Sequence, residues 1–196
     1  MADGINKTSN LIIISGPSGA GEDSIIEGLA RLMPLERVVT TTTRAQRPGD
    51  SDGSPYYFIS KKEFEHRIAE EKFFEHARHY NGNYYGVTFE EIERVKKSNR
   101  LGIWKIDYKG VLQAKKLIPG ISAILITAPL DILEQRIRRR SQVTDAYVAE
   151  RMAYTREWMK HIRMYDYVVE NVEGKLPETI EKVRQIMRGL DENGLA

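Results

Sequence analysis

The chain has 196 residues, of which 41% are hydrophobic and 30% are charged, and it contains no cysteine. A chain of this length can bury a core without disulfides, and the missing cysteines exclude a disulfide scaffold, thiolate zinc sites and cysteine nucleophiles. With 30 Lys+Arg against 28 Asp+Glu, the net charge of +2 does not indicate a general nucleic-acid binder. The clustering of the basic residues points instead to a small anionic ligand.

The longest apolar run covers residues 11–14, far short of the roughly 20 residues that span a bilayer. The first residues also lack the charged and then apolar pattern of a secretory leader. We therefore expect a cytoplasmic protein that has no membrane partner.

The first unit combines a strand, a glycine-rich turn and a helix. Residues 10–15 have the short β-branched run of a buried parallel strand, and residues 16–21 are rich in glycine. From Asp23 onward, Ile25, Ile26, Leu29 and Leu32 follow helical spacing up to Pro34. This order is the context of a phosphate-binding P-loop, in which backbone amides and a helix N-terminus hold phosphates. A connection without function is the competing interpretation.

A second stretch, residues 44–87, predicts an inserted strand-rich lobe. It follows a β-branched run at 38–43, which predicts one strand, and it opens with a basic, turn-rich segment. The remaining elements that we expect are a strand at 56–59, a helix from the cap Ser60 to about Glu71, a strand at 73–75 and a hairpin turn at 81–83.

Strands and helices alternate again after this lobe. The pattern predicts helices at 88–98, 111–117, 130–140, 144–162 and 176–190, with strands at 101–107, 121–128 and 165–170. Such alternation favours an α/β fold with a parallel sheet.

Several motifs, taken in chain order, make the sequence resemble guanylate kinase over roughly residues 10 to 190. They are Gly16 to Gly21 with Ser24, Thr42-Thr43-Arg44 with Arg47-Pro48-Gly49, Asp52-Gly53, Tyr56, and Gly82-Asn83-Tyr84-Tyr85-Gly86. The resemblance implies a single domain, 1–196, with the P-loop NTPase fold and a parallel core sheet. Its parts would be a core at 8–42, 91–134 and 156–196, an inserted strand-rich GMP-binding lobe at 43–90 and a helical lid at 135–155.

The resemblance also implies the reaction, in which Mg²⁺-dependent transfer of a phosphoryl group turns ATP and GMP into ADP and GDP. GMP and ATP would be the partners, without nucleic acid, and the protein would be a monomer or a homodimer. The residues that the resemblance assigns to GMP are Thr40, Arg44, Arg47, Tyr56, Glu75, Tyr85 and Asp107. Arginines suit the phosphate because they form bidentate hydrogen bonds, and the two carboxylates can accept from guanine N1–H and the 2-amino group.

The ATP side is implied in the same way. Its residues would be Gly16, Ser18, Gly19, Ala20, Gly21, Glu22, Asp23, Ser24 and Asn171, with Ser24 also on the metal. The catalytic residues would be Lys105, Arg136, Arg140 and Arg151, whose positive charge stabilises the transferring phosphoryl group.

The sequence departs from the family at four points. Glu22 replaces the P-loop lysine, Lys105 replaces the first acid of the family's Asp-Ile-Asp strand, Val87 replaces Ser or Thr, and one extra residue separates Glu75 from Gly82. The first two changes are opposite in sign, and the two strands concerned are neighbours in a P-loop fold. We therefore interpret them as a charge swap, in which Lys105 reaches the ATP phosphates and Glu22 pairs with Lys105 or helps to hold Mg²⁺.

Two alternatives stay open. Glu22 is consistent with a catalytically impaired module of the same fold that binds a nucleotide or a protein. The second alternative is a ribose 1,5-bisphosphate phosphokinase. Gly-Lys-Asp-Ser loops occur in those similar enzymes, and this chain likewise has Asp23 before Ser24.

Overall fold

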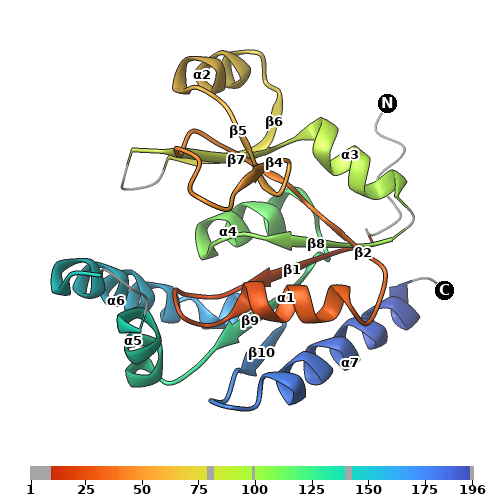
Figure 1. Ribbon diagram of the computed structural model, residues 1–196. Coiled ribbons are helices and arrows are strands. Elements are labelled where there is room, and N and C mark those ends of the chain that lie inside the picture. The colour runs from red at the N-terminus through yellow and green to blue at the C-terminus, as the bar shows by residue number, and fades with distance from the viewer. Residues whose placement is uncertain (1–9, 79–81, 99, 140–142, 195–196) are drawn as a thin grey trace.

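Two five-stranded sheets organise the residues that the computed structural model describes, 10–78, 82–98, 100–139 and 143–194 (Figure 1). The core sheet has the strand order β10-β9-β1-β8-β2, and each of its pairings is parallel. The lobe sheet has the order β4-β5-β3-β7-β6 and mixes parallel with antiparallel pairs. The predicted α/β fold with a parallel core sheet is confirmed.

The core sheet is apolar on both faces, as expected for parallel strands covered by helices. Its strands are β1 (Leu11–Ser15), β2 (Leu35–Arg37), β8 (Leu101–Lys105), β9 (Ser122–Thr127) and β10 (Tyr167–Glu170). Along β1, Leu11 and Ile13 join one hydrophobic cluster while Ile12 and Ile14 join the other. The alternation places the helices on two opposite sides of the sheet.

One face is covered by α1 (Glu22–Ala30), α7 (Leu176–Gly194) and part of α5 (Leu130–Arg138). The other face is covered by α3 (Phe89–Lys97), α4 (Tyr108–Leu117) and the C-terminal end of α6 (Asp145–Met159). A short 3-10 turn, Ile162–Met164, follows α6, so the helix expected at 144–162 ends earlier than predicted.

The lobe lies above the core in Figure 1 and contains β3 (Thr40–Thr42), β4 (Ser51–Asp52), β5 (Pro55–Phe58), β6 (Phe73–Arg78), β7 (Tyr84–Thr88) and α2 (Lys61–Ala69). Ser60 caps α2 by accepting from the Glu63 amide at 3.1 Å, as predicted. Strands β6 and β7 form the predicted antiparallel pair, although Asn81 of the expected turn lies outside the described residues.

The single strand predicted at 38–43 is wrong. The structure places Leu35–Arg37 in the core sheet and Thr40–Thr42 in the lobe sheet, with Val38 and Val39 between them. Val38 donates its amide to Ile103 O and Val39 donates to the buried Glu91 carboxylate. The β-branched run is therefore divided because the chain passes from one sheet to the other.

The lid predicted at 135–155 corresponds to the end of α5 and most of α6. Ile137, Val148 and Met152 form a small buried cluster of their own, apart from the two clusters that cover the core sheet. Among the described helices, none is both long and apolar enough to cross a membrane.

Candidate active site

The glycine-rich loop joins the C-terminal end of β1 to α1, as predicted for a phosphate-binding loop. Gly19 and Gly21 have φ angles of 89° and 90°, which residues with side chains rarely adopt. Gly21 is the N-cap of α1 and supplies no side-chain cap, so the loop turns into the helix through backbone alone. Ala20 is fully buried, whereas Ser18 is half-buried and Ser24 is exposed in the first turn of α1.

Lys105 reaches the start of α1, as the charge-swap hypothesis requires. Strands β1 and β8 are parallel neighbours with Ile14 opposite Lys105, so the end of β8 lies beside the loop. The Lys105 Nζ atom is 3.8 Å from Glu22 Oε1 and 2.5 Å from Asp23 Oδ2. An ammonium from the neighbouring strand thus lies beside the two carboxylates at the start of α1.

Asp23 receives a second cation that the sequence reasoning missed. Arg37, the last residue of β2, donates from Nη2 to Asp23 Oδ1 at 3.0 Å. Burial alone would raise the pKa of Asp23, but Lys105 and Arg37 together lower it below its ordinary value. Two carboxylates and two cations therefore meet where the helix begins.

Asn171 and Arg136 lie together against the glycine-rich loop. The Asn171 Nδ2 atom donates to Ala20 O at 2.8 Å, and Arg136 Nη2 donates to Asn171 O at 2.8 Å. Arg136 also donates to Gly19 O and pairs with Glu173 at 3.0 Å. The asparagine predicted to contact adenine thus contacts the loop, and Arg136 also donates a hydrogen bond to the loop backbone.

The lobe gathers four of the residues predicted to bind GMP. Arg44 pairs with Asp50 at 2.7 Å, and its guanidinium lies 5.3 Å from the centre of the Tyr56 ring. The Tyr56 and Tyr85 rings meet edge to face at 6.0 Å, and Asp50 also accepts from the Arg47 amide at 2.8 Å. These contacts place two arginines and two phenols on one part of the lobe.

Tyr85 is half-buried, and burial, followed by nearby Tyr56, raises the pKa of Tyr85. It therefore stays protonated at neutral pH and keeps an O–H donor. Thr40 is buried at the start of β3 opposite Tyr56 in the register. Val87 is buried, and Thr88, the neighbouring hydroxyl, caps α3 by accepting from the Glu91 amide.

Glu75 of the lobe and Asp107 of the core are close enough that the charge of Asp107 acts on Glu75. Glu75 lies on β6 with 8% of its surface exposed, and burial, followed by the charge of Asp107, raises its pKa to about 8. Asp107 is the N-cap of α4, where Oδ1 accepts from the Gly110 amide at 2.9 Å. Its other oxygen, Oδ2, accepts from Tyr154 Oη on α6 at 2.7 Å.

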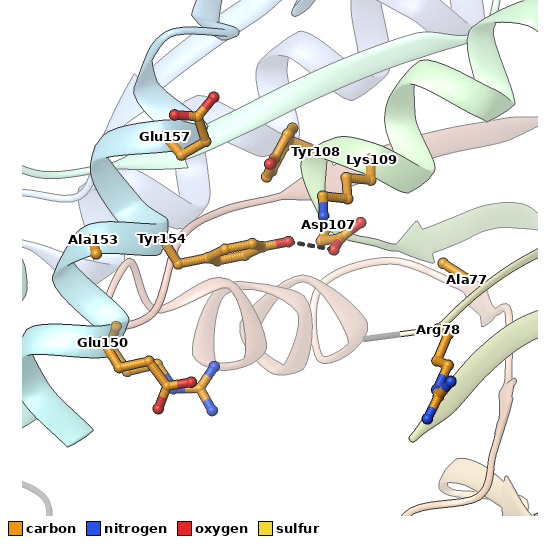
Figure 2. Close-up of a pocket in the computed structure, with 10 residues that line it drawn as sticks. Ala77, Arg78, Asp107, Tyr108, Lys109, Glu150, Ala153, Tyr154 and Glu157 are labelled. Carbon is orange, nitrogen blue, oxygen red and sulfur yellow. Dashed lines mark hydrogen bonds between the residues drawn. The ribbon is translucent and has the colours of Figure 1, made fainter. Parts of the chain in front are cut away.

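A pocket of about 430 Å³ lies beside this carboxylate (Figure 2). It is lined by the N-terminal end of α4, by α6 and by β6, and it includes Asp107, Lys109, Arg151 and Tyr154. The Arg151 guanidinium lies 4.9 Å from the Tyr147 ring centre. The pocket thus combines acceptors, cations and aromatic faces, which suits a polar, planar ligand.

The structure places three of the four predicted catalytic residues, each at a different point of the site. Lys105 is at the start of α1, Arg136 is at the glycine-rich loop, and Arg151 lines the pocket. Arg140 lies outside the described residues. Within the described ranges, no group of three or more His, Asp or Glu side chains is arranged to hold a metal ion by itself.

Sequence reasoning did not identify Arg37, Lys109 or Tyr154. Tyr154 follows Arg151 by three residues on α6, so helical spacing could have placed it on the same face. Arg37 carried no comparable signal, because only the pairing of β2 with β8 brings it near Asp23.

Comparisons with known proteins agree with this arrangement. A family model described as guanylate kinase matches residues 8–190. The guanylate kinase of Methylococcus capsulatus is 40% identical over 163 residues, which are 82% of this chain and 79% of that protein. The guanylate kinase of Idiomarina loihiensis is 40% identical over 166 residues, with 83% and 79% covered.

A solved structure is also similar. The crystal structure of guanylate kinase from Anaplasma phagocytophilum superposes with a TM-score of 0.72 at 25% identity, covering 93% of this chain and 87% of that one.

Proposed function

Since this chain belongs to the guanylate kinase family, we propose that it transfers the terminal phosphoryl group of ATP to GMP, giving ADP and GDP. One observation carries the proposal for this particular chain. Lys105, the last residue of β8, contacts the carboxylates at the start of α1, and Asp107, two residues later, lines the pocket. A single short segment thus joins a phosphate site to a site for a purine base.

On the acceptor side, Arg44 and Arg47 would hold the GMP phosphate, with Tyr56 and Tyr85 donating to the same oxygens. Glu75 and Asp107 would accept from guanine N1–H and the 2-amino group, and Thr40 would add a contact to the base. The proximity of Arg44 to Tyr56 and of Glu75 to Asp107 supports these two groupings. Adenine lacks both donors, so the carboxylates favour guanine.

On the donor side, the amides of residues 16–21 would surround the ATP phosphates, and Asn171 would contact the adenine. A carboxylate about 4 Å from a phosphate charge repels it by ~1 to 4 kcal/mol, depending on the effective dielectric. The Lys105 ammonium, 3.8 Å from Glu22 Oε1, offsets that repulsion and supports the charge-swap hypothesis.

Mg²⁺ is part of this proposal. The exposed hydroxyl of Ser24 and the carboxylates of Glu22 and Asp23 are oxygen donors at the start of α1, and Mg²⁺ prefers a few such protein ligands together with substrate phosphates. When bound, the ion would neutralise charge on the ATP oxygens. The oxygens of Ser24, Glu22 and Asp23 are consistent with that role, because Mg²⁺ in such sites is held mainly by substrate phosphates and does not require a cluster of acidic residues.

The chain's own residues would act by positioning and by positive charge, because the GMP phosphate is itself the nucleophile. Arg140 and Arg151 would stabilise the charge on the transferring group. Arg136, which contacts Gly19 and Asn171, would hold the glycine-rich loop and contribute charge from there. We propose that the lobe at 43–90 and the lid at 135–155 close over the substrates in the cytoplasm, where ATP and GMP are found.

A nucleotide-binding module without catalysis is the second candidate. The observation that favours it is Glu22, a carboxylate at the position where a phosphate-binding loop normally has a lysine. Under this alternative, Lys105 and Arg37 neutralise the carboxylates and no triphosphate binds.

The decisive experiment is steady-state nucleoside diphosphate formation with Mg-ATP, offering GMP, dGMP, AMP, UMP and ribose 1,5-bisphosphate separately. We expect product with the guanine nucleotides only. Product from ribose 1,5-bisphosphate alone would contradict the acceptor assignment. GMP binding without any product would contradict the kinase and support the binding module.

The same assay tests Lys105. In Lys105→Ala, we expect turnover to fall by about a hundredfold or more, the scale of losing one charge at the transferring group, while the calorimetric Kd for GMP changes by less than about twofold. Lys105→Arg, which keeps the charge, is the control and should retain part of the turnover. Unaltered turnover in Lys105→Ala would refute the compensation.

A further inference from the structure

Arg37 brings a second cation to the start of α1 from the edge strand of the core sheet. Strand β2 ends at Arg37, which lies opposite Ile103 of β8 in the parallel register, two positions before Lys105. The Arg37 Nη2 atom is 3.0 Å from Asp23 Oδ1, whereas Lys105 Nζ is 2.5 Å from Asp23 Oδ2. Each oxygen of Asp23 therefore holds a different cation, and the two cations come from neighbouring strands.

The backbone of Arg37 is fixed independently of this contact. Arg94 on α3 donates from Nη2 to Arg37 O at 2.9 Å, and it is held by two hydrogen bonds to the Glu91 carboxylate at 2.8 and 2.9 Å. Glu91 is buried, with 4% of its surface exposed, and it also accepts from the Val39 amide at 2.6 Å. The point from which the Arg37 side chain extends is thus set by a buried network, and Asp23 has only the side chain to orient.

The charges at the start of α1 balance only when Arg37 is included. Glu22 and Asp23 bring two negative charges to this point, and Lys105 balances one of them. Burial alone would raise the pKa of Asp23, but Lys105 and Arg37 together lower it, so Asp23 keeps its charge at neutral pH. A carboxylate here repels a phosphate, and the second cation offsets that repulsion.

The Arg37 guanidinium has donors to spare for an anionic ligand. A guanidinium carries five N–H donors in a planar fork, and in the described part of the chain only the Asp23 carboxylate accepts from it. Because 30% of the Arg37 side chain is exposed, a ligand at the start of α1 can reach the other donors. An arginine can bind a phosphate through two parallel hydrogen bonds, whereas the Lys105 ammonium acts as a point charge.

We propose that Arg37 binds the terminal phosphates of ATP beside Lys105, held at the start of α1 by Asp23. This inference rests on the proposed function, which places the ATP phosphates at the glycine-rich loop and the beginning of α1. The loop supplies backbone amides, and the ends of β8 and β2 supply two cations. Arg37 belongs to the core sheet and not to the lid, so its contribution does not depend on lid closure.

The test separates phosphate binding from simple neutralisation of Asp23. We measure the calorimetric Kd for Mg-ATP and for GMP, and the steady-state kcat and KM, in Arg37→Ala, Arg37→Lys, Asp23→Asn and the double variant Asp23→Asn with Arg37→Ala. Arg31→Ala is the matched control, because Arg31 is exposed at the C-terminal end of the same helix and its substitution removes the same charge. Melting curves verify that each variant folds.

For Arg37→Ala we expect the KM and Kd for Mg-ATP to rise by about tenfold, the scale of losing a hydrogen-bonded contact to a charged group. The kcat should fall by less than about threefold, and the Kd for GMP should stay within about twofold. Arg37→Lys should recover part of the affinity, because it keeps the charge and loses the planar fork. In the Asp23→Asn background, Arg37→Ala should still raise the Kd for Mg-ATP by about threefold or more.

Three results would overturn the inference. An unchanged Kd for Mg-ATP in Arg37→Ala would show that the guanidinium does not reach the phosphates. A loss of the same size in Arg31→Ala would show a general effect of net charge. No effect of Arg37→Ala in the Asp23→Asn background would show that Arg37 only neutralises that carboxylate.

Failure of the proposed function gives a different result. Wild-type protein that binds Mg-ATP and GMP but forms no GDP would contradict the kinase, and the comparison of Kd values for Mg-ATP would still decide the role of Arg37. Wild-type protein that does not bind Mg-ATP would overturn both.

Discussion

At the scale of single residues, Glu75 and Asp107 are two carboxyl groups in different surroundings. Glu75 is almost fully buried on β6, and its pKa of about 8 reflects that burial first and the charge of Asp107 second. Asp107 accepts hydrogen bonds from Gly110 and Tyr154. In the free protein at neutral pH, Glu75 is therefore mostly protonated.

This distribution predicts how GMP use depends on pH. Glu75 must lose its proton to accept from the base, so kcat/KM for GMP should rise with pH up to about 8 and level off above it. The measurement is a pH profile of kcat/KM from about one unit below that value to about one unit above it. Glu75→Gln should give a lower and flat profile, and an inflection that persists in this variant would assign the titration to another group.

The same shift has a consequence for stability. Because the folded protein raises the pKa of Glu75 from 4.5 to about 8, folding favours the protonated carboxyl. That contribution is complete below the unfolded value and is lost as the pH rises through the folded value. GMP binding, which favours the ionised form in our proposal, opposes the loss.

At the scale of elements, α2 holds the lobe together through one side chain. Phe64 is fully buried and stacks on Phe73 at 4.2 Å and on Tyr84 at 5.1 Å, so it joins α2 to both strands of the β6–β7 hairpin. Tyr84 is next to Tyr85 in the sequence, and Phe73 lies two positions before Glu75. The aromatic stack thus supports residues on both sides of the proposed GMP site.

Phe64→Ala is expected to destabilise the protein by about 3–5 kcal/mol, the usual cost of removing a buried phenylalanine. The measurement is denaturant-induced unfolding, with the Kd for GMP measured under folding conditions. Phe89→Ala is the control because Phe89 is 51% exposed, and it should change stability by less than about 0.5 kcal/mol. Equal effects of the two substitutions would contradict the assigned role of the stack.

The elements differ in how well the sequence predicts them. The β1 strand is predicted from its short apolar run, and the Ser60 cap and the glycine-rich turn are predicted closely because their hydrogen bonds lie within a few residues. The division of 38–43 between two sheets was not predicted, since β-branched residues suit either sheet. The approach of Lys105 to the loop followed from the expected strand order, whereas Arg37 and Tyr154 depend on packing between distant elements.

At the scale of the whole molecule, the core sheet carries the proposed donor site and the lobe carries most of the proposed acceptor site. The end of β8 and the residues after it connect them, because Lys105 pairs with α1 and the charge of Asp107 acts on Glu75 of the lobe. Charge at the start of α1 should therefore govern ATP binding while leaving GMP binding to the lobe. This separation makes the charge-swap hypothesis testable by exchanging the two charges.

The exchange consists of Glu22→Lys, Lys105→Asp and the double variant. Residues 22, 23 and 105 carry a net charge of −1 in the wild type, and the double variant keeps that value. Lys105→Asp alone places three carboxylates together and should abolish stabilisation by Mg-ATP, which in the wild type reaches about 2.7 kcal/mol at 100 times Kd. The double variant should recover most of that stabilisation and turnover within about tenfold of wild type, since the same charges return from exchanged positions.

Thermal unfolding with Mg-ATP or GMP measures both sites at once, and GMP should stabilise all four proteins equally. A double variant as inactive as Lys105→Asp would show that position, and not net charge, decides whether the loop accepts a triphosphate.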